Sequence, residues 1–271
     1  MGLILRFLGT GAAEPIPTPG CSCANCTHAL QDSSARRSQS GMVLIDEGGQ
    51  YVVDCGPAAV SGGHWVDAKP IKGVFISHLH PDHGLGLYSI RWTKQKSPVP
   101  TFLPPDTSES DRDGLAHESV RLENWLSLRP TRLDPYSVVA VDGLSAIALE
   151  LCHGNTPTQG FLFESGGVTI AYLIDSKGLP ERTAEILRGI ETIDCVVVDA
   201  TYRPGRDDPR HNNVDEAIDL GVGLGARLVV LTHIGHHNLS KPELETYVEE
   251  RTTASTDQTF ICAYDGLTLT F

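Results

Sequence analysis

Short apolar runs, separated by glycine and proline, recur along the chain and predict many strands. Two pairs of runs flank a Gly-Gly dipeptide, which predicts a β-hairpin for each pair. These pairs are residues 42–45 with 51–54 and residues 161–164 with 168–174. The apolar residues 1–8 predict a first strand, because a Gly-Thr-Gly turn follows them.

Further segments complete a mixed α/β (α+β) pattern. Residues 195–198 and 227–231 are continuously apolar, as expected of strands buried on both faces. Helical spacing of apolar positions is clearest over residues 180–190 and 214–221. Residues 105–135 are polar and poorly patterned, and we interpret them as a surface insertion that forms either a lid or a plain loop.

Polar, chemically competent residues lie at or just past the ends of these apolar runs. They are Asp54, His78, His153, Asp175, Asp199 and His233. Loops at strand ends, held by a rigid sheet, commonly carry catalytic groups. The pattern therefore predicts one site assembled from several strand ends.

The densest polar motif is His78-Leu79-His80-Pro81-Asp82-His83, which directly follows an apolar run. Imidazole nitrogens and carboxylate oxygens are ligands for divalent metals. One ion needs about four ligands, so this motif supplies more than half of a site. With the isolated histidines and aspartate downstream, it indicates two neighbouring ions.

We expect a binuclear arrangement of these residues. His78, His80 and His153 would hold one ion, Asp82, His83 and His233 the other, and Asp175 would bridge them. Ions about 3.5–4 Å apart can share a hydroxide and clamp both oxygens of a displacement at phosphorus. No cysteine occupies an expected ligand position, so the site accepts zinc, manganese or iron. Asp82 is also a candidate catalytic residue.

Cys21, Cys23 and Cys26 form a second candidate metal site in a loop near residues 20–28. Three thiolates and one imidazole complete a tetrahedral structural zinc site. The fourth ligand could be His28, which is close in sequence. It could also be His236 or His237, which follow His233 and would tie the loop to the active-site strand.

The strand-end residues and the His78–His83 motif, in this order, resemble the metallo-β-lactamase superfamily. The resemblance implies an αββα sandwich, with two mixed β-sheets flanked by helices and a binuclear site at one edge. It covers almost the whole chain, so we expect residues 1–271 to form a single domain. Asp54 would then orient the metal loop and would not bind metal itself.

The Cys-x-Cys-x-x-Cys loop, the Ile174-Asp175-Ser176-Lys177-Gly178 segment and the Leu231-Thr232-His233 segment further resemble one family. This is the PhnP family, the phosphoribosyl 1,2-cyclic phosphate phosphodiesterases of phosphonate catabolism. The resemblance implies that His236 completes the zinc site, that the protein is a homodimer, and that the active site can hold manganese. It also implies hydrolysis of 5-phosphoribosyl 1,2-cyclic phosphate to ribose 1,5-bisphosphate.

His211 matches a family position expected to lie over the site. It would protonate the departing sugar oxygen or contact phosphate, although an exposed loop histidine is the competing interpretation. Arg206 and Arg210 are candidates for gripping the 5-phosphate, because a guanidinium pairs well with phosphate.

Charge and composition restrict the partners. The net charge of −13 disfavours a nucleic-acid surface, which depends on Lys and Arg. It therefore disfavours a transfer-RNA 3′-processing nuclease, and no basic arm is present. A PqqB-like cofactor-biosynthesis protein and a metal-binding scaffold without turnover also compete with the hydrolase interpretation. Seven cysteines, no export signal and no membrane-length apolar run predict a cytoplasmic protein with reduced thiols.

Overall fold

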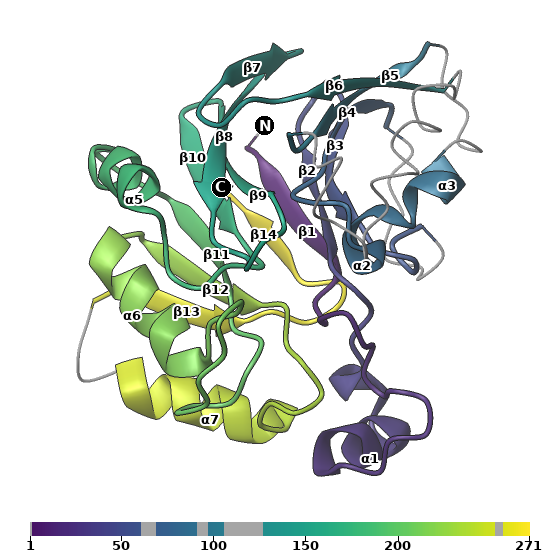
Figure 1. Cartoon of the computed structure of the whole chain (residues 1–271), viewed down its shortest axis with the longest axis vertical. Coiled ribbons are helices and arrows are strands. Elements are labelled where there is room, and N and C mark those ends of the chain that lie inside the picture. Colours follow the sequence, from purple (N-terminus) through teal and green to yellow (C-terminus); the bar gives the residue numbers. More distant parts are fainter. Residues whose placement is uncertain (1, 61–68, 91–96, 106–126, 253–256) are drawn as a thin grey trace.

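Two seven-stranded sheets pack face to face, and helices cover their outer faces (Figure 1). The computed structural model describes residues 2–60, 69–90, 97–105, 127–252 and 257–271. This four-layer arrangement is the αββα sandwich expected from the sequence. No helix in the described part of the chain combines the length and the apolar character needed to cross a membrane.

The first sheet has the strand order β14-β1-β2-β3-β4-β5-β6. Strand pairs from β14 to β3 are antiparallel, and those from β3 to β6 are parallel. The strands are β1 Ile4–Gly9, β2 Gly41–Ile45, β3 Gln50–Cys55, β4 Ile71–Phe75, β5 Val99–Leu103, β6 Leu128–Arg132 and β14 Thr268–Thr270.

The second sheet has the order β13-β12-β11-β10-β9-β8-β7. Here the pairs from β7 to β10 are antiparallel and those from β10 to β13 are parallel. The strands are β7 Val138–Val141, β8 Leu144–Leu151, β9 Thr158–Ser165, β10 Val168–Leu173, β11 Cys195–Asp199, β12 Leu228–Thr232 and β13 Thr259–Cys262.

Most helices follow a strand in the sequence. They are α1 Ala24–Gln31, η1 Ser33–Ala35, α2 Pro81–Gly84, α3 Leu87–Ile90, α5 Glu181–Arg188, α6 Val214–Leu224 and α7 Lys241–Thr252. Helices α5, α6 and α7 bury Leu187, Ile218 and Leu244 in one apolar cluster with the second sheet. A capping box between Asn213 and Glu216 begins α6, which satisfies backbone N–H groups at that terminus.

Aromatic side chains fill the space between the two sheets. The Phe75 ring of β4 lies 4.9 Å from Phe102, 5.4 Å from Phe161 and 5.1 Å from Phe163, measured between centroids. All four rings belong to the same buried cluster. Burying one such side chain contributes about 1.5–3 kcal/mol, so this contact holds the sheets together and fixes the ends of their strands.

Most predicted elements are confirmed. Both hairpins form, as β2–β3 and β9–β10, and the continuously apolar runs are the parallel strands β11 and β12. The predicted helices correspond to α5 and α6. We predicted a surface insertion over residues 105–135, but residues 128–132 of that range form strand β6, so the prediction was wrong there. Residues 106–126, in which the lid was predicted, lie outside the described residues.

Candidate metal centre

The parallel strands of both sheets direct their carboxyl ends to one edge, where the candidate residues meet. Asp54 lies at the end of β3, and His78 follows β4. His153, Asp175 and His233 follow β8, β10 and β12. His80 is the N-cap of α2, and this short helix contains Asp82 and His83.

The structure groups these side chains into two adjoining sets. His78, His80 and His153 form the first set, and Asp82, His83, Asp175 and His233 form the second. Within each set the potential ligand atoms all lie within 4.8 Å of one another. These are the two sets that the sequence predicted.

Asp175 connects the two sets. Its Oδ2 lies 2.6 Å from His83 Nε2 and 3.6 Å from His78 Nε2, and its Oδ1 lies 3.2 Å from His233 Nε2. The side chain is almost completely buried. Its Oδ2 therefore faces an imidazole of each set and its Oδ1 faces the second set, so the carboxylate lies between the two sets.

Hydrogen bonds at Nδ1 fix the orientation of the imidazole rings. Ser77 Oγ donates to Asp54 and lies 3.1 Å from His78 Nδ1, so it accepts from that ring. The His83 Nδ1–H donates to Asp54 Oδ2 at 2.9 Å. Thr201 Oγ1 donates to Asp199 and lies 2.8 Å from His233 Nδ1, so it too acts as acceptor.

His153 has the same arrangement, because its Nδ1 lies 3.3 Å from the carbonyl oxygen of Arg210. In four rings Nδ1 is therefore engaged outward, which leaves Nε2 for the centre of the cluster. A ring whose Nδ1 is hydrogen-bonded in this way can bind a metal through Nε2. His80 instead presents Nδ1, at 2.8 Å from His78 Nε2.

Buried atoms without hydrogen-bond partners provide a test of metal binding. Among the described residues, His83 Nε2, His233 Nε2 and Asp175 Oδ2 have no partner with hydrogen-bonding geometry. Each such buried atom costs about 1–3 kcal/mol. Because these atoms converge on common points, a divalent cation would satisfy them together. The His/Asp cluster is consistent with a binuclear metal site.

Asp54 accepts hydrogen bonds from residues of the cluster but belongs to neither ligand set. Besides Ser77 Oγ and His83, it accepts hydrogen bonds from the Ser77 backbone N–H at 2.7 Å and from Tyr172 OH at 2.9 Å. It therefore has the contacts of an orienting residue, in agreement with the prediction.

Backbone strain coincides with this site. Asp54, Asp175 and His233 have φ angles of 52°, 52° and 58°, a left-handed conformation that costs roughly 1–3 kcal/mol for residues other than glycine. Each residue ends a strand and turns its side chain into the cluster. Such conformations persist only where surrounding contacts enforce them, so the strand ends are held in place by the fold.

Charges within the cluster are strongly coupled. Burial alone would lower the pKa of His83, but Asp82, Asp175 and Asp54 raise it well above its usual value. Burial would raise the pKa of Asp175, but His233, His83 and His78 hold it well below its usual value. Burial lowers the pKa of His78, which favours the neutral ring that a metal needs.

Sequence reasoning missed a carboxylate–imidazole pair beside this cluster. Asp199 Oδ2 lies 2.8 Å from His211 Nδ1, and His211 Nδ1 is also 3.2 Å from Asp175 Oδ1. Burial opposes protonation of His211, but Asp199, Asp175 and Asp208 raise its pKa to about 9. His211 is therefore no exposed loop histidine. The signal available in the sequence was the position of Asp199 at a strand end.

The two arginines have different surroundings. Arg210 packs its side chain against Gly154 and gives its carbonyl oxygen to His153. Arg206 stacks on Tyr202, with its Cζ atom 4.2 Å from the ring centroid. It lines a separate surface cavity with Arg203, Leu239 and Tyr247.

The cysteine loop forms a second cluster with His236. The thiols of Cys21 and Cys23 lie 3.4 Å and 3.7 Å from His236 Nδ1, and all four ligand atoms are within 4.8 Å of one another. Cys23 caps the N-terminus of α1. Burial opposes ionisation of the Cys23 thiol, but hydrogen bonds from the Cys26 N–H and with His236 lower its pKa to about 6. These residues could hold a structural zinc.

The two remaining histidines considered for this cluster lie outside it. His28 Nε2 is 3.8 Å from Asp32 Oδ2, one helical turn further along the chain. The His237 ring lies beside the His236 ring, tilted by 39° with the centroids 3.8 Å apart. Only two residues separate His233 from His236. Hydrogen bonds from Ile234 N–H to Thr10 and from Gly235 N–H to Thr201 fasten this short link.

Comparison with curated proteins gives distant relatives. The octanoyltransferase of Porphyromonas gingivalis is 25% identical over 235 residues, which cover 85% of this chain and 46% of that protein. The ribonuclease Z of Halorubrum lacusprofundi is 28% identical over 170 residues, which cover 60% of this chain and 48% of that protein. The chain thus spans about half the length of these two relatives.

Solved structures match over nearly the whole chain. The crystal structure of a diphosphatase from the PhnP family has a TM-score of 0.79 at 25% identity and covers 100% of this chain and 98% of that one. Zinc-bound PqqB from Methylobacterium extorquens has a TM-score of 0.77 at 19% identity, with coverage of 98% and 99%.

Family membership follows from the fold, the His/Asp cluster and the sequence match. Residues 50–234 match the family described as a beta-lactamase superfamily domain. This range contains every residue of the His/Asp cluster. The two-sheet architecture and the order of the metal-binding motifs agree with that match. The chain therefore belongs to the metallo-β-lactamase superfamily.

Proposed function

We propose that the protein is a metal-dependent hydrolase that opens a small cyclic phosphodiester. The observation that carries this proposal is the set of three imidazoles, of His78, His83 and His233, with Nδ1 engaged outward and Nε2 facing the Asp175 carboxylate. The likeness to a PhnP-family diphosphatase supports chemistry at phosphorus. The candidate natural substrate is 5-phosphoribosyl 1,2-cyclic phosphate, with ribose 1,5-bisphosphate as the product.

The proposed ligand sets are those predicted from the sequence. His78, His80 and His153 would hold one ion, and Asp82, His83 and His233 the other, with Asp175 between them. When bound, two divalent ions supply an activated water and stabilise charge on the phosphoryl oxygens. Manganese and zinc both suit this nitrogen and oxygen donor set.

His211 is the proposed general acid. A pKa of about 9 keeps it protonated at neutral pH, so it holds a proton to give to the departing oxygen. Asp199 anchors Nδ1, which leaves Nε2 for the substrate. Thr201 links Asp199 to His233, so the acid is positioned from the same hydrogen-bond network as a proposed ligand.

Arg210 is the better candidate for gripping a distal phosphate. Its backbone contacts His153 and its side chain lies over Gly154, at the edge of the cluster. Arg206 faces a cavity formed with Leu239 and Tyr247, which argues for a role outside the substrate site.

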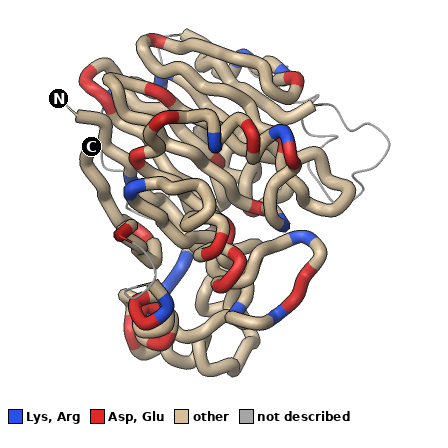
Figure 2. The backbone as a smooth tube through the Cα atoms, turned by 90° about the vertical axis from the view of Figure 1, so that its left-hand side faces the viewer, with Lys and Arg blue, Asp and Glu red and all other residues tan. Residues whose placement is uncertain are grey.

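A diphosphate substrate is the second candidate, favoured by the structural likeness to a PhnP-family diphosphatase. Cleavage of a diphosphate and of a cyclic diester both displace oxygen from phosphorus, so the same ligand sets serve both. A ribonuclease Z activity has less support. The chain carries a net charge of −13, and Figure 2 shows acidic and basic positions interspersed on that side with no continuous basic band among the described residues.

A substrate panel tests these proposals. Protein loaded with manganese or zinc would be assayed with 5-phosphoribosyl 1,2-cyclic phosphate, a 2′,3′-cyclic nucleotide, a nucleoside diphosphate sugar and precursor transfer RNA. The proposal predicts the highest kcat/KM for the ribosyl cyclic phosphate. A higher value for the diphosphate would favour the second candidate, and turnover of the RNA alone would refute both.

A further inference from the structure

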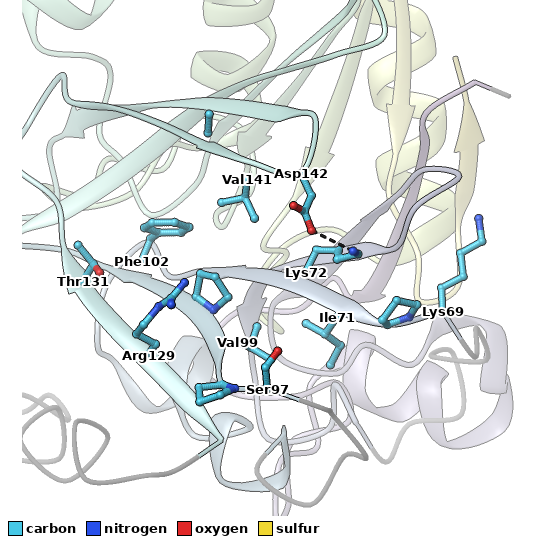
Figure 3. Close-up of a pocket in the computed structure, with 14 residues that line it drawn as sticks. Lys69, Ile71, Lys72, Ser97, Val99, Phe102, Arg129, Thr131, Val141 and Asp142 are labelled. Carbon is cyan, nitrogen blue, oxygen red and sulfur yellow. Dashed lines mark hydrogen bonds and ion pairs between the residues drawn. The ribbon is translucent and has the colours of Figure 1, made fainter.

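A cavity lies between strands β4–β6 of the first sheet and the β7–β8 turn of the second sheet (Figure 3). Its volume is about 920 Å³, and its walls come from the start of β4, from residues along β5 and β6, and from the β7–β8 turn. Strands β4, β5 and β6 are parallel, so their starts and ends lie at opposite edges. Lys72 and Arg129 lie near the starts of β4 and β6, whereas the His/Asp cluster lies beyond the strand ends.

Positive charge exceeds negative charge around the cavity. Lys69, Lys72 and Arg129 line it, with Asp142 as the one lining carboxylate among the described residues. Lys72 Nζ lies 2.9 Å from Asp142 Oδ2. Lys69 donates to the backbone carbonyl of Asp46. In a chain with a net charge of −13, this local excess of cations is distinctive.

Of the three cations that line the cavity, Arg129 is the most available for binding a ligand. Its side chain is exposed, and no ion pair joins it to another residue in the described part of the chain. Arg129 and Thr131 alternate with residues of the opposite face along β6, so both project into the cavity. A guanidinium offers paired donors that match phosphate oxygens.

Apolar side chains form the rest of the wall. Figure 3 shows Arg129 and Lys72 on opposite sides, with Phe102 and Val141 between Arg129 and Asp142. Three prolines also line the cavity, and proline has no backbone N–H to donate. The side chains of Arg129 and Lys72 therefore supply charged donors, and the apolar wall suits the body of an organic molecule.

We propose that this cavity binds a small organic phosphate, whose phosphate group pairs with Arg129, whose ring packs against Phe102 and Val141 and whose far end contacts Lys72. Lys72 has three donors, so it can keep Asp142 and still bind a hydroxyl oxygen of the ligand. The site is independent of the reaction at the metal centre, and its volume suits a ligand of the size of a sugar phosphate or nucleotide.

Calorimetric titration of the metal-loaded protein with ribose 5-phosphate tests this proposal. We expect a class of binding sites whose occupancy leaves hydrolysis uninhibited. Arg129→Gln should weaken that class by roughly tenfold or more, because it removes a charge-assisted pair, and should leave kcat/KM unchanged. Lys72→Gln should weaken it as well. Circular dichroism would verify that both variants are folded, which their surface positions favour.

Arg188→Gln is the matched control, since it removes the same charge from the exposed face of α5. It should leave the binding unchanged. Absence of non-inhibitory binding in the unaltered protein would overturn the proposal, as would its persistence in both Arg129→Gln and Lys72→Gln. Equal binding of uncharged ribose or of citrate would overturn the assignment to phosphate.

Discussion

The His/Asp cluster and the cysteine cluster meet on one short segment, between His233 and His236, yet they are assembled in opposite ways. The first gathers side chains from positions 78 to 233, at the ends of strands in both sheets. The second takes three thiols from residues 21–26 and adds one imidazole. The His/Asp cluster is therefore positioned by the whole fold, whereas the cysteine cluster attaches one local loop to the rest of the protein.

Because the two clusters are assembled differently, we expect the first to serve catalysis and the second to serve the stability of the fold. The strained strand ends at Asp54, Asp175 and His233 are enforced by the sheets and their hydrogen bonds, which involve no metal. The cysteine loop has few such constraints, since the buried apolar cluster beside it contains only Ile16, Ala29 and Ala35 among the described residues. Loss of metal should therefore affect catalysis at the first cluster and stability at the second.

The largest effect is expected for Asp175→Asn. Loss of the bridging charge removes several kcal/mol of stabilisation, and each 1.36 kcal/mol is tenfold, so kcat/KM should fall by roughly a thousandfold or more. Asp207→Asn, at a side chain that is 95% exposed, is the control and should be neutral. Steady-state kinetics and metal analysis would measure both. Full turnover by folded Asp175→Asn would remove the catalytic role assigned to the first cluster.

His211→Asn should come next, with kcat lowered by about a hundredfold or more, as is typical of a lost general acid. Its metal content should remain normal, because His211 lies outside the proposed ligand sets. A substrate whose leaving group needs no protonation, such as a p-nitrophenyl phosphodiester, should be much less affected. An equal loss on both substrates would indicate a structural or phosphate-binding role for His211.

Cys23→Ser should show the opposite pattern. We expect a fall in Tm of about 5–10 °C, which for a chain of this size corresponds to roughly 2–3 kcal/mol, while the two ions of the first cluster remain bound. Calorimetry and metal counting would test this. Cys262→Ser, at a buried thiol away from both clusters, controls for the loss of a cysteine. Unchanged Tm in Cys23→Ser would mean that the loop needs no metal.

The smallest effect is expected for Tyr172→Phe, which removes one of the hydrogen bonds to Asp54. The remaining donors, Ser77 and His83, should keep the carboxylate in place. Metal affinity should therefore fall by no more than about tenfold, consistent with one neutral hydrogen bond of about 1 kcal/mol. Metal titration would detect this shift, and a complete loss of binding would show that Asp54 depends mainly on the tyrosine.

The fold and the first cluster were predictable because their signals are local. Gly-Gly dipeptides between apolar runs defined the hairpins, and the His78–His83 motif placed four candidate ligands in six residues. The convergence of His153, Asp175 and His233 came from their positions at strand ends and from the family resemblance. The local sequence alone does not predict the distances between these three side chains.

The features that were missed depend on tertiary contacts. For the cysteine cluster the local sequence left His28, His236 and His237 open. Only the family resemblance implied His236, which the backbone link through Gly235 brings to the three thiols. Strand β6 is an edge strand in which only Leu128 is buried, so it lacks an apolar run. The pairing of Asp199 with His211 joins a strand end to a loop whose path no local pattern specifies.

The position of β14 has a consequence for synthesis of the chain. Residues 268–270 pair with β1, so one of the earliest strands to be made is covered by one of the latest. Asp265 likewise accepts hydrogen bonds from the backbone of Thr10 and Ser38, beside the cysteine loop. On the ribosome, β1 therefore lacks one neighbouring strand until residues 268–270 have been made, and its unpaired backbone groups stay open to wrong pairing during that interval.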